Sequence, residues 1–166
     1  MTSITRELEQ EAEITSRVLA RVPEDKLTWK PHAKSMTLGQ LALHTATIPG
    51  AMAGILAADS LEVDPATFGQ APQPASLREI MDGFEGSVAA ARDFLNGLSS
   101  EKAEAIWPLT AGGREMVAAP REWIIRSIMF NHWYHHRGQL SVYLRLLDIP
   151  VPKIYGASAD ENPFRA

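Results

Sequence analysis

Apolar residues recur at α-helical spacing in four stretches of this 166-residue chain. The pattern predicts helices over residues 3–23, 37–58, 76–98 and 120–148. The second and third stretches each begin with Ser or Thr followed three residues later by Gln or Glu, the signature of a capping box. These pairs are Thr37 with Gln40 and Ser76 with Glu79. Pro120 occupies the place of a first-turn proline in the fourth helix, and Pro49 predicts a kink in the second.

The remaining segments lack a helical period. Residues 59–75 contain three prolines and are expected to form a long connection. Residues 107–120 are interrupted by glycines and partly β-like, which permits a turn or a small hairpin, and the tail 149–166 is expected to be irregular. Four amphipathic helices with one long crossover predict an all-α fold, an antiparallel four-helix bundle, in a single domain over residues 1–166.

Composition narrows the classes of partner. The chain has 16 basic and 20 acidic residues, a net charge of −4 and no cluster of Lys and Arg, which argues against nucleic-acid binding. A small-molecule substrate is the better expectation. Because the chain contains no cysteine, it has no disulfide framework or thiol nucleophile, and any metal site must use nitrogen and oxygen ligands.

Nothing in the sequence predicts a membrane partner. The N-terminal stretch MTSITRELEQEAE is charged where a signal peptide would be continuously apolar, and no run approaches the ~18 apolar residues of a membrane span. We therefore expect a soluble cytoplasmic protein.

Histidines provide the candidate chemistry. On the fourth helix, positions 125, 128, 132, 136, 140, 143 and 147 form an apolar stripe that His132 and His136 interrupt at i and i+4, whereas His135 lies on a mixed edge. His44 falls between Leu41 and Ile48 on an apolar face of the second helix. Imidazoles from two facing helices can converge on one Zn²⁺, Ni²⁺ or similar divalent ion. The alternative is that each is an ordinary core histidine with a satisfied hydrogen bond.

Two stretches carry a resemblance to a known family. LTWKPHAKSMTLGQLALHTA and NHWYHHRGQLSVYLRLLDIPVP resemble the DinB/YfiT-like superfamily of small four-helix proteins, and the likeness covers nearly the whole chain. The resemblance implies a divalent metal held by His44, His132 and His136. It also implies an up-down-down-up course with the crossover after the second helix. Some members are thiol transferases or isomerases that use a low-molecular-weight thiol, and many others have no assigned reaction.

Two functions remain open at this point. The first is a metal-dependent enzyme that activates a low-molecular-weight thiol, or water, for transfer to a small electrophile, as a thiol transferase or hydrolase does. The second is a non-catalytic stress-response or ligand-binding module whose metal is structural and enclosed. The motifs contain no obvious fourth ligand, which favours the enzyme. The resemblance and the apolar tail favour a homodimer.

The sequence indicates the roles of the residues beside the histidines less strongly. Arg137 is expected to project to the edge of the bundle and pair with a carboxylate, although contact with an anionic substrate is the alternative. Gln139 and Asn131 either hold an imidazole tautomer of a ligand or are ordinary surface amides. Nearby aromatic residues are expected to fill the core. These are Trp29, Trp133 and Tyr134.

Overall fold

The computed structural model describes residues 3–64 and 71–164. Its long helices are α1 (Ser3–Leu19), α2 (Leu38–Ala57), α3 (Leu77–Gly97) and a continuous segment made of α5 (Arg121–Ile124), a π-helical turn (Ile125–Phe130) and α6 (Asn131–Leu146). A 3-10 turn (Glu24–Lys26) follows α1, and the short α4 (Ser100–Glu104) follows α3. Helical periodicity in the sequence thus located each long helix to within a few residues.

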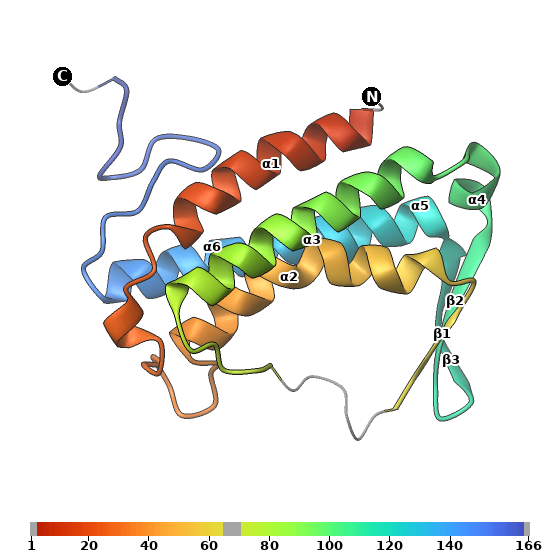
Figure 1. The fold of residues 1–166 in the computed structure, drawn as a ribbon, viewed down its shortest axis with the longest axis horizontal. Coiled ribbons are helices and arrows are strands. Elements are labelled where there is room, and N and C mark those ends of the chain that lie inside the picture. Colours follow the sequence, from red (N-terminus) through yellow and green to blue (C-terminus); the bar gives the residue numbers. More distant parts are fainter. Residues whose placement is uncertain (1–2, 65–70, 165–166) are drawn as a thin grey trace.

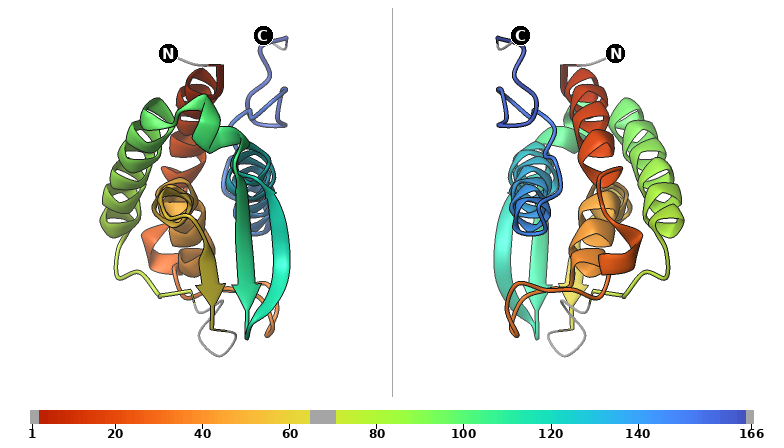
Figure 2. Two further views of the ribbon diagram at one scale, coloured as in Figure 1. Left: turned by 90° about the vertical axis from the view of Figure 1, so that its right-hand side faces the viewer. Right: turned by 90° about the vertical axis from the view of Figure 1, so that its left-hand side faces the viewer.

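The helices pack around a shared apolar core. Along the chain α1 runs in one direction, α2 and α3 run in the other, and the α5–α6 segment returns in the direction of α1 (Figure 1). Viewed end-on, α2 lies between α3 and α6, with α1 above it (Figure 2). This is the up-down-down-up course that the resemblance implies, and it places α2 directly beside α6, so that side chains of the two helices can share a site.

Helix starts follow the predicted caps. The Thr37 hydroxyl accepts a hydrogen bond from the backbone N–H of Gln40, and the Gln40 side chain accepts one from the backbone N–H of Thr37, which completes a capping box at α2. At α3, the Ser76 hydroxyl accepts from the Glu79 N–H. Pro120 is the cap of α5 rather than its first residue, because its backbone is still extended at the end of a strand.

The all-α expectation is wrong in one respect, because the described residues include a small sheet of order β1-β2-β3. Its strands are β1 (Leu61–Val63), β2 (Ile106–Ala111) and β3 (Arg114–Pro120). Strands β2 and β3 form the hairpin that the sequence permitted, joined by Gly112 and Gly113 at positive φ, which glycine adopts without strain. The connection after α2 contains β1, which pairs in parallel with β2, and its residues 65–70 lie outside the described part.

The C-terminal tail is irregular, as expected, and is held to the helices by polar contacts. Asp160 pairs with Arg145 of α6 and accepts from the backbone N–H of Val151, while Glu161 pairs with Arg17 of α1. These contacts order residues 149–164 without secondary structure. In the part of the chain that the structure describes, no helix is both long and apolar enough to cross a bilayer.

Candidate metal centre

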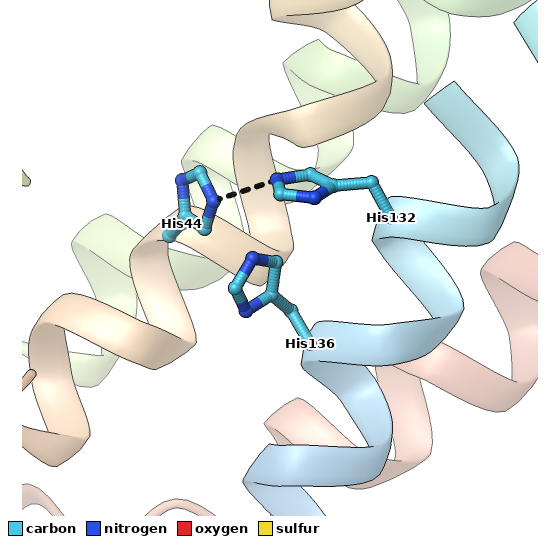
Figure 3. Close-up of side chains that lie close together, drawn as sticks. All are labelled: His44, His132 and His136. Carbon is cyan, nitrogen blue, oxygen red and sulfur yellow. Dashed lines mark hydrogen bonds between the residues drawn. The ribbon is translucent and has the colours of Figure 1, made fainter. Parts of the chain in front are cut away.

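Three histidine side chains meet between α2 and α6. His44 projects from α2, and His132 and His136 project from successive turns of α6, so that the rings face one another (Figure 3). Nε2 of His44 lies 3.2 Å from Nε2 of His132, and one ligand atom from each of the three residues lies within 4.8 Å of the others. The histidines that periodicity selected from separate helices therefore occupy one place in the fold.

The spacing of these nitrogens suits a shared ion. Two imidazole nitrogens bound at about 2.1 Å lie about 3.0 Å apart at an octahedral angle and about 3.4 Å apart at a tetrahedral one. The 3.2 Å between His44 and His132 falls between these values. The ring of His136 has its centroid 4.5 Å from that of His44 and 4.3 Å from that of His132. The three residues thus form a group that could hold a divalent cation.

Electrostatics keep the imidazoles neutral. Burial, and then the neighbouring charges of His132 and His44, lower the pKa of His136 to about 4. Burial is also the main cause that lowers the pKa of His44, with the charge of His132 second. It likewise lowers the pKa of His132, ahead of the charge of His135. A neutral imidazole offers the lone pair that a cation requires, so the site is prepared for a metal near neutral pH.

Gln139 selects the tautomer of His136. Its Oε1 atom lies 2.8 Å from Nδ1 of His136. Since an amide oxygen can only accept, Nδ1 must donate, and the lone pair is left on Nε2. This contact favours the orienting interpretation of Gln139, although its side chain is exposed. Asn131 is also exposed, as an ordinary surface amide is. His135 is also exposed and lies outside the group, with its ring 5.0 Å from that of His136.

The apolar stripe predicted on the last helix is only partly buried. Ile125, His136 and Leu140 are buried as expected, whereas Ile128 and His132 are half-buried and the neighbouring Met129 and Trp133 are buried instead. The cause is the π-helical turn before α6, where the N–H of Asn131 bonds to the carbonyl five residues earlier. Such a turn contains an extra residue and rotates everything that follows. His132 and His44 are half-buried at the rim of the apolar face, whereas His136 is buried.

The prediction that Arg137 projects to the bundle edge is wrong, although its carboxylate partner is present. Arg137 is 1% exposed, and its Nη2 lies 2.6 Å from Oε2 of Glu11 on α1. Its Nη1 donates to the hydroxyl of Thr15, and its guanidinium lies against the rings of Tyr134 and Tyr155. The sequence signal for this pair was a glutamate three residues after Leu8 on the apolar side of α1.

Aromatic residues near the histidines fill the core, as predicted. Trp133 is 1% exposed, and its indole nitrogen donates to the carbonyl oxygen of Thr45 at 2.9 Å. Trp29 packs edge-on against Tyr143, with the ring centroids 5.8 Å apart. The hydroxyl of Tyr134 donates to Glu7 on α1 at 2.7 Å. These residues connect α6 to α1, to α2 and to the loop before α2.

Comparisons with known proteins show the family and the fold. A family model described as DinB family matches residues 1–162. The uncharacterized protein YrdA of Bacillus subtilis is 26% identical over 155 residues, which cover 92% of this chain and 86% of that protein. A crystal structure of a DinB-like protein from Bacillus cereus has a TM-score of 0.65 at 22% identity, covering 90% of this chain and 94% of its own. Another, from Bacillus subtilis, has a TM-score of 0.69 at 18% identity, covering 93% and 98%.

Proposed function

This chain belongs to the DinB family, and from that premise we propose that it binds one divalent metal ion through His44, His132 and His136. The observation that carries the proposal is the convergence of three imidazoles from two helices, with Nε2 of His44 and His132 3.2 Å apart. His44 and His132 can share a hydrogen bond through these nitrogens, and His136 has Gln139 as a partner, so polar satisfaction alone does not distinguish core histidines from ligands. What favours a metal site is that the three rings converge on one place and that the pKa of every ring is lowered.

We further propose that the site is catalytic. Among the described residues, the group that could hold an ion consists of these three histidines and includes no carboxylate. Three protein ligands are typical of catalytic sites, which keep a position for substrate, whereas structural sites use four. A divalent ion bound there would supply Lewis acidity and lower the pKa of a coordinated thiol or water. His44 and His132 are half-buried, so a small molecule can approach them.

Residues of this chain would orient the ligands and exclude water from the site. Gln139 holds the Nε2 lone pair of His136 toward the other rings, and the surrounding core excludes water from the inner side of the site. Because the protein lacks cysteine, a thiol reactant must come from solution. The reaction that fits best is transfer of a low-molecular-weight thiol to a small electrophile, with hydrolysis as the alternative use of the same site.

Metal titration tests the binding step. Metal-free protein should take up one equivalent of Zn²⁺, Ni²⁺ or Mn²⁺ in calorimetry, and His136→Ala should abolish uptake. His32→Ala is the matched control, since His32 lies exposed in the loop before α2 and outside the group. Equal uptake by wild type and His136→Ala would refute the metal site.

A second experiment tests the chemistry. The loaded protein is screened with a panel of low-molecular-weight thiols against a generic electrophile, with His136→Ala as the inactive reference. Activity that is equal in both proteins, or absent for every thiol and metal, would favour the non-catalytic binding module.

We also propose that the protein forms a homodimer. Apolar side chains are exposed on the last helical segment, including Trp123, Val142 and Leu146, each more than half accessible. Exposed apolar surface of this kind is commonly buried in a symmetric contact. Light scattering at micromolar concentration should give twice the chain mass, and a monomer mass would refute the dimer.

A further inference from the structure

Pro49 lies in the middle of α2, which continues through it without a break. Proline has no backbone N–H, so the carbonyl of Thr45, four residues earlier, loses the donor that an α-helix normally supplies. Thr45 is fully buried, and water cannot replace that donor. A carbonyl left without a partner in such a place would destabilise the fold.

Trp133 of α6 supplies the missing donor. Its indole Nε1–H donates to the Thr45 carbonyl oxygen at 2.9 Å, and the Trp133 side chain is itself buried. A bond that belongs to one helix is thereby replaced by a bond between two helices. Its direction and length are restricted in a way that apolar contacts are not.

This bond lies immediately beside the histidines. Thr45 follows His44 in α2, and Trp133 follows His132 in α6. The Trp133–Thr45 bond therefore joins the two helices one residue away from the pair whose Nε2 atoms are 3.2 Å apart. Any change in the separation or register of α2 and α6 at this level would move the two rings relative to each other.

The residue after Pro49 secures α2 on its other side. The N–H of Gly50 donates to the hydroxyl of Ser87 on α3 at 2.7 Å. A Cβ atom at Gly50 would lie only 2.7 Å from Cα of Ser87, so the two helices approach as closely as glycine permits. The Pro-Gly pair thus places α2 between α6 and α3 about one and a half turns beyond His44.

We infer that Pro49 and Trp133 are positioning residues of the histidine site: the proline frees a carbonyl, and the tryptophan uses it to hold α2 and α6 at the separation that aligns His44 with His132. The inference rests on the proposed metal-binding function. Metal sites require their ligands to be held within a fraction of an ångström, and residues that orient ligands typically change metal affinity by about 10–100-fold.

Removal of the indole donor is the central test. Trp133→Phe keeps a buried aromatic ring and removes the N–H. We expect the melting temperature of the metal-free protein to fall by about 5 °C, because the Thr45 carbonyl loses its partner. We expect Zn²⁺ affinity, measured by competition with a chromophoric chelator, to fall about tenfold.

A second substitution separates positioning from stability. In Trp133→Phe/Pro49→Ala, the new N–H at position 49 can bond to the Thr45 carbonyl within α2. The melting temperature should then recover to that of Pro49→Ala alone, whereas Zn²⁺ affinity should stay about tenfold low because the interhelical bond is still absent. Affinity that recovers together with stability would show that Trp133 is merely structural.

Trp107 provides the matched control. It is equally buried, and its indole N–H also donates to a main-chain carbonyl of the α2 terminus, that of Ala58, at 3.0 Å. Ala58 is fourteen residues after His44, or about 20 Å along a helix. Trp107→Phe should leave Zn²⁺ affinity unchanged even if it lowers the melting temperature.

The outcomes distinguish this inference from the function on which it rests. Wild type that binds Zn²⁺ no better than His136→Ala refutes the metal site and the inference together. Wild type that binds, with Trp133→Phe binding equally tightly, refutes only the positioning role. The inference is supported if affinity falls in both Trp133→Phe proteins and is retained in Trp107→Phe.

Discussion

Replacement of Arg137 by methionine should destabilise the protein strongly, even though the residue lies outside the histidine group. The Arg137 guanidinium donates to the Glu11 carboxylate at 2.6 Å, to the Thr15 hydroxyl at 3.0 Å and to the Tyr155 hydroxyl at 2.5 Å. The Tyr155 hydroxyl in turn donates to Glu11 at 3.1 Å. Methionine preserves much of the volume but leaves the Glu11 carboxylate without its cation.

The expected magnitude follows from the burial of that carboxylate. The side chain of Glu11 is 11% exposed, so solvent can compensate little of the lost charge pairing. Breaking a buried ion pair by removing one partner typically costs about 3–5 kcal/mol. For a chain of this length, that corresponds to a fall of about 10 °C in melting temperature. Removing both charges, in Glu11→Met/Arg137→Met, should cost much less, since an apolar pair of similar volume leaves no uncompensated charge.

Urea unfolding of the metal-free proteins, followed by circular dichroism, measures these differences. The comparison requires wild type, both single variants and the double variant, from which the coupling free energy is obtained. The reasoning would be refuted if the free energy of unfolding of Arg137→Met lay within about 0.5 kcal/mol of that of wild type, which is the range of ordinary surface substitutions. A double variant less stable than Arg137→Met would refute it as well.

Three further predictions follow from the packing and the pKa shifts. In urea unfolding, Gly50→Ala should destabilise the protein by about 1–3 kcal/mol because the new Cβ would collide with the α3 backbone. Gly54 lies on the same helix, but a Cβ there would meet nothing within 4 Å, so Gly54→Ala should stabilise the protein by about 0.5–1 kcal/mol. In the folded protein the pKa of His136 is lowered to about 4, so between pH 4 and the ordinary value of 6.5 the unfolded chain binds more protons than the folded one. The free energy of unfolding of the metal-free protein should therefore fall as the pH falls through this window, and it should fall less steeply in His136→Gln. Gln139→Ala should weaken Zn²⁺ binding about tenfold in calorimetry, because it releases the Nδ1–H of His136. Asn131→Ala should leave Zn²⁺ affinity unchanged, and a larger loss of affinity in Asn131→Ala than in Gln139→Ala would contradict the orienting role.

Local patterns in the sequence determined the helices and the choice of histidines. A helix that buries one face repeats its apolar residues every three or four positions, and a capping box needs only residues three apart, so both signals are readable in one short stretch. The same periodicity placed His44 on an apolar face of α2 and paired His132 with His136 on α6. The absence of cysteine restricted any metal site to nitrogen and oxygen ligands.

Contacts between distant segments were decided only by the tertiary structure. Strand β1 has three residues and acquires its conformation by pairing with β2, more than forty positions later in the chain. Arg137 is buried because Glu11, 126 positions away, neutralises it, and a local pattern cannot show whether a charge will find such a partner. The π-helical turn before α6 changed which side chains of that helix are buried, and the carbonyl freed by Pro49 found its donor in Trp133, 88 positions from Thr45. Periodicity thus reports which side of a helix is apolar, whereas the partner that each polar group finds there depends on how the helices dock.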